Sequence, residues 1–440
     1  MHRASTLGAV LCGLLVSAPT WGQTPERPSG PVSDTTTTAV SLTLDEALRL
    51  ALQDNPDYLA VTQRLDVAEA DVRTASTYPW NPELELEGPG SLSRGSLGRY
   101  EARLSQEVEW AGQMGLRTRA AEFGSTAAGG EVRNSARELV REVEVAYANL
   151  IAARSRRAVA EDIRLLNERL RNAVGVQLTE GEVSVLQANL VEIESGRARA
   201  RVLEEERRVR TAEIELAHIL GLPAGTAIAP RDGEDAPPPE ADQLSETDLL
   251  AEAILRRPDL EAAEAAVARS RALDRLATRE ALPNLRLQGI AEREAPGAEL
   301  RWGLGLSISV PLFDRNQGLR TRRDAELRAS SLRHEGALLR VEAEVRDALQ
   351  VYRAVAEELR IYETAVFEPA TRNQDLLEAA YTEGKLDLEA LLLLRNQLLD
   401  AELGYWATWA RHREAWAALR AATGANLEDV TPASNEEGSR

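Results

Sequence analysis

Cysteine and histidine are scarce in this 440-residue chain, which has one cysteine and four histidines. Cys12 lies in an apolar stretch near the N-terminus, and His2, His218, His334 and His412 are scattered. No HExxH pattern is present, and no two histidines lie four residues apart. A disulfide framework and a histidine metal centre are therefore excluded, and we predict no catalytic residue, no metal site and no cofactor.

Aromatic residues and long apolar runs are scarce too. Aromatic residues make up 4% of the chain. Beyond the N-terminal region there is no run of about 18 apolar residues, the length that indicates a membrane-spanning helix, so we expect no such helix. The formal net charge of -19 argues against nucleic acid and against anionic membrane surfaces as partners. Alanine, leucine, arginine and glutamate dominate, which is typical of long helices.

The first 22 residues have the pattern of a secretory signal peptide. Arg3 supplies the positive charge, and Leu7–Ala18 supply a short apolar core. A bulky leucine precedes Cys12, so we predict cleavage without a lipid anchor. Residues 23–42, rich in proline, serine and threonine, are expected to form a flexible segment. An exported chain without a membrane helix is a periplasmic protein, a secreted protein or a membrane β-barrel.

Arg301–Leu312 has the alternating pattern of a β-strand. One side is large and apolar throughout, whereas the other carries glycine, serine and proline. Either a protein core or lipid can cover such a side, and about eleven residues suit a tilted membrane strand. For the membrane case we predict these lipid-facing residues: Trp302, Leu304, Leu306, Ile308 and Val310.

Alternation predicts three further strands, at about residues 81–88, 99–110 and 283–291, besides the one at about 300–312. In the first two, one side is charged. It is either the solvated face of a soluble sheet or the lining of a lumen. The residues predicted to line the lumen are Glu83, Glu85, Glu87, Glu101, Arg103, Glu107 and Glu109. Trp110 and Trp302 fall near strand ends, where an aromatic girdle is expected, although core packing would also explain them.

The chain repeats itself at an offset of about 202 residues. Pro56-Asp57 is matched by Pro258-Asp259, and Thr179-Glu180-Gly181 is matched by Thr382-Glu383-Gly384. The strand PELELEG is matched by PNLRLQG. We therefore predict a tandem duplication. Its parts are a first repeat at 43–221, a linker at 222–244, a second repeat at 245–424 and a C-terminal tail at 425–440.

Most of each repeat has helical periodicity. A Thr43–Glu46 capping box predicts a helix over 43–77, interrupted at Pro56. Long helices are expected over 114–174, with a weak point at Gly129-Gly130, and over 182–220. In the second repeat, apolar residues between 345 and 366 follow heptad spacing, which indicates a coiled coil.

Four strands cannot close a membrane barrel, because single-chain barrels begin at about eight strands. An open sheet has unpaired backbone groups at its edges, which lipid does not tolerate. Two interpretations follow. Either three chains share one twelve-stranded barrel, or the hairpins are soluble and the protein is a periplasmic or secreted structural coiled-coil protein.

From about Leu42 to Gly424 the sequence resembles the TolC-like outer-membrane efflux proteins. The resemblance rests on three pairs of segments, one member in each repeat. They are SLTLDEALRLALQDNP (41–56) with LLAEAILRRPDLEAA (249–263), QEVEWAGQMGLR (106–117) with SISVPLFDRNQGLR (307–320), and LTEGEVSVLQANL (178–190) with YTEGKLDLEALLLLRNQL (381–398). The EWxGxxGLR form is similar to the heavy-metal branch, the outer-membrane partners of cation-exporting RND pumps.

The resemblance implies a mainly α-helical homotrimer in the outer membrane. Its 12-stranded barrel, with four strands per chain, would continue as a long α-helical coiled-coil tunnel across the periplasm. The trimer would be a passive export duct rather than an enzyme, binding a periplasmic adaptor and an inner-membrane RND pump. The helix tips would form the periplasmic entrance, where we predict an acidic gate. The tip residues are Gly181, Glu182, Gly384, Asp387 and Glu389.

Overall fold

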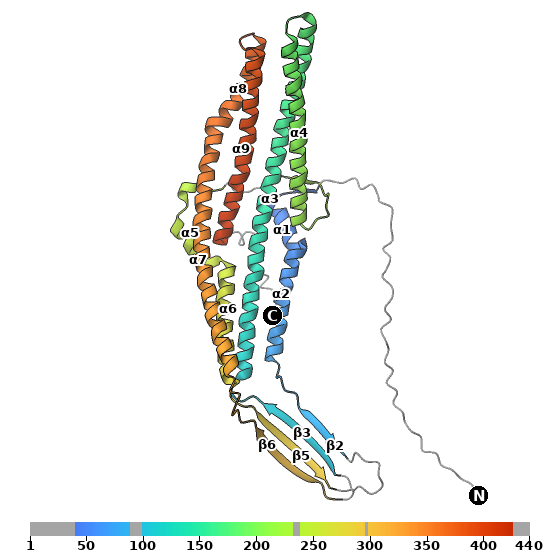
Figure 1. Ribbon diagram of the computed structural model, residues 1–440, viewed down its shortest axis with the longest axis vertical. Coiled ribbons are helices and arrows are strands. Elements are labelled where there is room, and N and C mark those ends of the chain that lie inside the picture. The colour runs from blue at the N-terminus through green and yellow to red at the C-terminus, as the bar shows by residue number, and fades with distance from the viewer. Residues whose placement is uncertain (1–39, 89–98, 232–237, 295–297, 426–440) are drawn as a thin grey trace, which may run out of the picture. The chain divides into compact units, whose positions relative to one another are not determined.

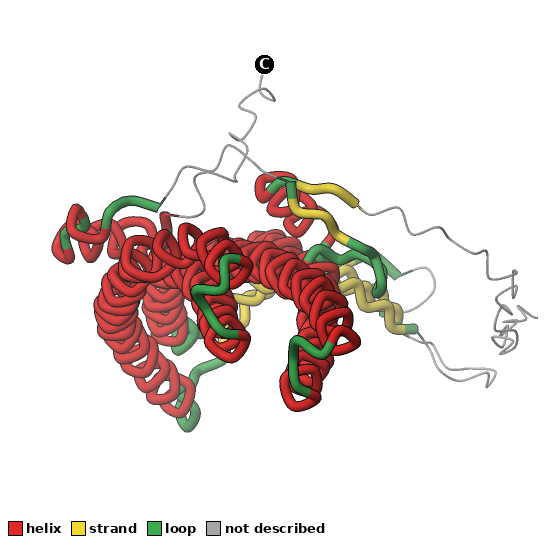
Figure 2. Tube along the Cα trace, turned by 90° about the horizontal axis from the view of Figure 1, so that it is seen from above, coloured by secondary structure: helices red, strands yellow, loops and turns green. Residues whose placement is uncertain are grey.

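The computed structural model describes residues 40–88, 99–231, 238–294 and 298–425. The predicted signal peptide, most of the segment expected to be flexible, and the C-terminal tail from residue 426 lie outside these ranges. Within them, long helices lie side by side, and a four-stranded sheet lies beyond one end of α2, α3, α6 and α7 (Figure 1). Figure 2, which looks along the helices, shows them in a curved row.

The two halves of the chain share one order of main elements: two helices, two strands and two long helical segments. The first half holds β1 (Val40–Leu42), α1 (Leu44–Asp54), α2 (Pro56–Ser76), β2 (Glu83–Glu87), β3 (Tyr100–Val108), α3 (Gln113–Glu180) and α4 (Val185–Ile219). The connection holds β4 (Ile228–Pro230) and the 3-10 helix η1 (Ala241–Gln243). The second half holds α5 (Glu246–Arg256), α6 (Pro258–Arg279), β5 (Leu285–Arg293), β6 (Arg301–Ile308), α7 (Gln317–Ile361), the π-helix η2 (Tyr362–Phe367), α8 (Glu368–Thr382) and α9 (Leu388–Thr423).

The predicted break at Pro56 is confirmed, and capping explains it. Thr43 and Glu46 form the predicted capping box at the start of α1. Asn55 separates α1 from α2, and its side chain accepts a hydrogen bond from the Tyr58 amide at 2.8 Å. Its Nδ2 also donates to the Ile219 carbonyl at 2.8 Å, which ties this break to the end of α4.

The two hairpins join into one antiparallel sheet. Its strand order is β2-β3-β5-β6, so β3 of the first repeat pairs with β5 of the second. The register places Leu104 opposite Gly289, and Glu107 opposite Arg286. Within the described residues β2 and β6 each have one neighbour, so both edges of the sheet are open. The sequence predicts the hairpins, and the structure adds the pairing between them.

Helix α3 is the longest of the described helices, and it contacts helices of both repeats. It has 68 residues and packs against α2, α4, α6 and α9. At about 1.5 Å per residue it is about 100 Å long. The expected weak point at Gly129-Gly130 is wrong: the helix is continuous there. A Cβ atom on Gly130 would lie 2.8 Å from that of Ala262, so the glycine permits close contact with α6.

Several element boundaries differ from the expected ones. Val40–Leu42, at the end of the segment expected to be flexible, form β1, which pairs in parallel with Ile228–Pro230 of the linker. β6 ends at Ile308, so Val310 and Leu312 follow the strand instead of belonging to it. In the predicted heptad region, Val345, Tyr352 and Leu359 are buried, but the α-helix gives way to η2 at Tyr362.

Candidate functional site

The strand register places the predicted lumen residues within the sheet on one face. Residues directly opposite one another in paired strands point to the same side of a sheet. Glu85 lies opposite Arg103, and Glu87 lies opposite Glu101. The same face continues onto β5 and β6. It carries Glu83, Glu85, Glu87, Glu101, Arg103, Glu107, Arg286, Glu292 and Arg301, and we call it the charged face.

Arginines neutralise much of this acidic charge. Arg103 donates to Glu101 at 2.6 Å and to Glu85 at 3.2 Å. Arg99 forms ion pairs with Glu101, at 3.2 Å, and with Glu292. These pairs offset the repulsion between carboxylates that lie directly opposite one another, as Glu101 and Glu292 do. The charged face is therefore a network of opposite charges rather than a row of free carboxylates.

The sequence prediction missed the arginines of the second hairpin. Arg286 lies 3.4 Å from Glu107 and 3.8 Å from Glu83. Asn284 donates to Glu107 at 2.8 Å. The alternation of the segment PNLRLQG is the signal that could have placed this arginine on the polar side. Its carboxylate partners depend on the pairing between repeats, which the sequence does not reveal.

Glu109 differs from the other predicted lumen residues. It follows the end of β3, and its side chain is 6% exposed. Arg117 of α3 donates to it at 2.7 Å. Burial raises the pKa of the nearby Glu280 carboxyl, and the Arg117 charge opposes this. Glu109 thus helps to connect the sheet to the helices.

The opposite face of the sheet is apolar and exposed. The predicted residues Leu304, Trp302 and Leu306 are 96%, 78% and 67% exposed. Ile308 is exposed too, and Val310 is exposed beyond the strand end. Further members of this apolar face come from the other strands: Leu84, Leu86, Leu104 and Leu287. Large contiguous apolar surfaces of this kind mark a contact with protein or lipid.

The two helical tips have ordinary capping geometry. Gly181 and Gly384 have φ angles of 79° and 71°, which favour glycine. The amide after each glycine donates to a carbonyl five residues earlier, which closes a Schellman motif. Asp387 caps α9 by accepting a hydrogen bond from the Ala390 amide at 2.7 Å. Gly181, Gly384 and Asp387 therefore each have a structural role at the tips.

The two remaining tip carboxylates, Glu182 and Glu389, are exposed. Below the tips a leucine-rich cluster joins the two helical hairpins, and it includes Val174, Val191, Leu388 and Leu391. The acidic gate stays a prediction, because no described contact brings these carboxylates together within one chain.

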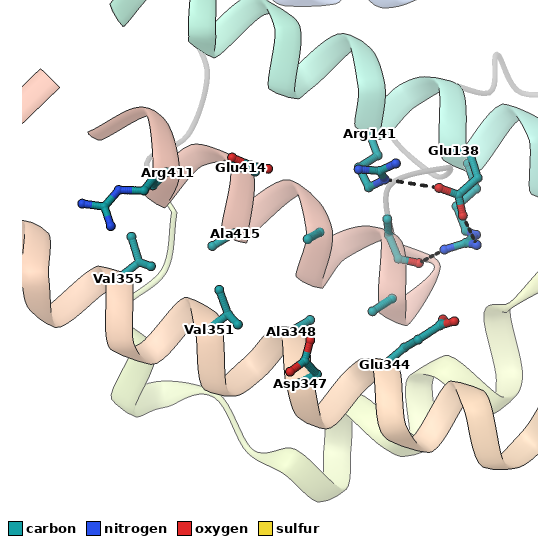
Figure 3. A pocket seen from close by; sticks show the side chains of 14 residues that line it. Glu138, Arg141, Glu344, Asp347, Ala348, Val351, Val355, Arg411, Glu414 and Ala415 are labelled. Atoms are coloured by element: carbon teal, nitrogen blue, oxygen red, sulfur yellow. Dashed lines mark hydrogen bonds and ion pairs between the residues drawn. The ribbon is translucent and has the colours of Figure 1, made fainter. Parts of the chain in front are cut away.

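A recess of about 550 Å³ lies between α3, α7 and α9. Ala348 of α7 and Ala415 of α9 line it from two sides, together with charged side chains such as Glu344 and Arg141 (Figure 3). At one end Arg137, which is buried, donates to the Ala421 carbonyl near the end of α9. Arg257 contacts the next carbonyl, of Ala422, at 3.3 Å. The two positive charges offset the partial negative charge at the C-terminal end of α9. They also connect that end of α9 to both repeats.

Neither metal chemistry nor a helical membrane span is evident in the described residues. No group of three or more histidine, cysteine, aspartate or glutamate side chains in these residues is arranged to hold a metal ion. None of the described helices is both long enough and apolar enough to cross a membrane.

Solved structures share this fold. The CmeC outer membrane channel of Campylobacter jejuni has a TM-score of 0.73 at 16% identity, covering 93% of this chain and 94% of that one. CusC, whose structures concern folding and transmembrane channel formation, has a TM-score of 0.72 at 19% identity, covering 92% and 99%.

Sequence comparison identifies the family. The cobalt-zinc-cadmium resistance protein CzcC of Cupriavidus metallidurans is 24% identical over 279 residues, which span 63% of this chain and 65% of that protein. The family model described as outer membrane efflux protein matches residues 47–222 and again 249–425. These matches favour the membrane interpretation over a soluble coiled-coil protein. The chain belongs to the outer membrane efflux protein family and is located in the outer membrane.

Proposed function

We propose that three copies of this chain form a passive export channel of a tripartite RND-type efflux system. In this assembly the apolar face contacts lipid and the charged face lines the lumen of a twelve-stranded barrel. The helices continue the duct through the periplasm to an adaptor and an inner-membrane pump. The tips, with Gly181, Glu182, Gly384, Asp387 and Glu389, form its entrance.

The observation that carries the proposal is the sheet itself: four antiparallel strands with an exposed apolar face, an internally paired charged face and two open edges. Open edges are not tolerated in lipid, so each edge needs a partner strand. Because neighbouring strands alternate in direction, β6 of one copy runs antiparallel to β2 of the next. Successive copies therefore extend the sheet without breaking its pattern, and closure removes every edge.

Metal cations are the cargo that we propose. CzcC, which the chain resembles, is named for cobalt, zinc and cadmium resistance. The carboxylates of the charged face are largely paired with arginine, which favours transit over tight retention of cations. In cells that lack the gene, cobalt, zinc and cadmium should accumulate, and the wild-type gene should lower them. Equal metal contents in both strains would contradict this cargo.

Cysteine cross-linking tests the shared barrel. The chain has one cysteine, Cys12, within the predicted signal peptide, so introduced cysteines have no competitor in the mature protein. The first variant combines Leu84→Cys on β2 with Leu304→Cys on β6. Within one chain these two cysteines would lie three strand spacings apart. That separation is about 14 Å, too far for an internal disulfide. Oxidation in membranes should therefore give covalent dimers and trimers in this register or in a neighbouring one, such as Leu86→Cys with Leu304→Cys.

The matched control moves the first cysteine to an inner strand. Leu104 lies directly opposite Leu84 on the same face, but β3 has a partner on both sides. Leu104→Cys with Leu304→Cys should stay monomeric on denaturing gels. Absence of cross-links for every edge register, or equal cross-linking of the control, would contradict the shared barrel.

A further inference from the structure

We propose that the arginines near the sheet end of α6 bind anionic phospholipid headgroups at the inner boundary of the outer membrane. The inference rests on the proposed function, because it takes the apolar face to lie in lipid. It adds a second, charged contact with the bilayer, made by a helix rather than by the strands.

Arg271, Arg275 and Arg279 form one stripe, because residues four apart lie on the same side of a helix. All three are exposed, and within the described ranges none forms an ion pair or a side-chain hydrogen bond. From residue 269 to 279 there are four arginines and a single acid, Asp274. Elsewhere arginines are commonly paired, as Arg133 is with Glu261 at the other end of α6.

The position of Glu280 indicates which side of α6 carries the stripe. Burial raises the pKa of the Glu280 carboxyl, directly after α6, and besides Arg323 of α7 the charges of Arg117 and Glu109 act on it. Those two residues form the ion pair that continues the charged face into the helices. Successive helical residues are about 100° apart, so Arg271 and Arg275 lie about 180° and 140° around the helix from Glu280, and Arg279 about 100°. We therefore place the stripe on the side of α6 away from the charged face, which is the side of the apolar face.

The depth of Arg275 and Arg279 matches a headgroup layer, and Arg271 lies about one turn beyond it. Arg279 is the last residue of α6, so Arg275 and Arg271 lie about 6 and 12 Å from the helix end. A headgroup layer is about 5–8 Å thick on each side of the hydrocarbon. The apolar surface begins just beyond the helix end, and it includes Leu287 and Phe313, the latter 92% exposed. Guanidinium groups at this level can snorkel toward phosphates and bind them through two hydrogen bonds.

Neither the net charge of the chain nor the dipole of α6 rules out this lipid contact. The net charge of -19 opposes binding to anionic surfaces. The Debye length is about 8 Å in physiological salt, so binding of a headgroup depends on the charges close to it. Arginines in a last turn also offset the helix dipole. That explains Arg279, but the dipole effect is confined to the last turn, and Arg271 lies two turns from the end.

The test uses the full mature protein in phosphatidylcholine nanodiscs, with and without phosphatidylglycerol. The thermal unfolding midpoint is followed as phosphatidylglycerol is raised, and its dependence on concentration gives the affinity. A basic residue near an anionic surface adds about fivefold in affinity, so the double variant Arg275→Gln/Arg279→Gln should bind phosphatidylglycerol about 25-fold more weakly. The double variant Arg275→Lys/Arg279→Lys should keep most of the preference.

The matched control removes two exposed arginines far from the sheet, with Arg169→Gln on α3 and Arg207→Gln on α4. It changes net charge equally and should bind like the wild type. Loss of preference in this control, or its retention in the α6 glutamine variant, would overturn the inference and leave the channel standing. A protein that does not enter nanodiscs at all would overturn the proposed function and, with it, the inference.

Discussion

The substitution Leu306→Arg distinguishes a strand that faces lipid from a strand that faces water. Leu306 is near the middle of the apolar stretch from Trp302 to Leu312, and its side chain is largely exposed in the single chain. At the midplane of a barrel an arginine costs about 2–4 kcal/mol per chain, or about 6–12 kcal/mol for three copies. On an exposed soluble surface the same change usually costs within about 0.5 kcal/mol.

The assay measures how much protein assembles in the outer-membrane fraction as a detergent-extracted oligomer. Leu306→Arg should almost abolish assembly. The matched control is Gly303→Arg, on the opposite face of the same strand, where a Cβ atom would have open space. It should assemble nearly as the wild type does. Normal assembly of Leu306→Arg, or equal failure of both variants, would refute the assignment of the two faces.

Three further predictions concern the helices. Gly221→Ala should lower the free energy of unfolding by about 2–5 kcal/mol, because φ is 69° and the new Cβ would lie 2.3 Å from the Asp54 carbonyl oxygen of α1. Gly225→Ala, where the Cβ has open space, should cost only about 1 kcal/mol. Equal losses for the two variants in denaturant titrations would contradict this. Arg156→Met should cost about 3 kcal/mol, because it leaves the fully buried Glu205 without its closest partner, and the double variant with Glu205→Met should regain most of the loss. Burial is the main cause, and the charge of Arg413 the lesser one, that lowers the pKa of His412 below its usual 6.5. Stability should therefore fall as the pH drops below 6.5 toward the folded-state pKa, and His412→Gln should flatten that dependence in thermal melts. An unchanged slope in that variant would refute the assignment.

Local patterns in the sequence predict the elements well. The capping box at Thr43 and Glu46 depends on residues three apart, and the strand faces depend on a period of two. Both are visible without knowledge of distant contacts. The exposed apolar side of β6 and the shared polar side of β2 and β3 follow from alternation alone.

Features that depend on contacts between repeats could not be predicted. The charged face is neutralised by Arg286 only because β5 pairs with β3. Gly130 was expected to weaken a helix, because glycine lowers helix propensity, but its actual role is set by the close approach of α6. Strand β1 needs a partner in the linker, at Ile228–Pro230, and three residues carry no pattern that reveals it.

The native mass of the protein, extracted from membranes in mild detergent, decides whether three chains share one barrel. Each chain supplies four strands of a sheet whose edges are open. We expect a trimer that needs detergent to stay in solution. A monomer or dimer that is stable without detergent would contradict it, and the apolar face of the sheet would then have to be covered by protein.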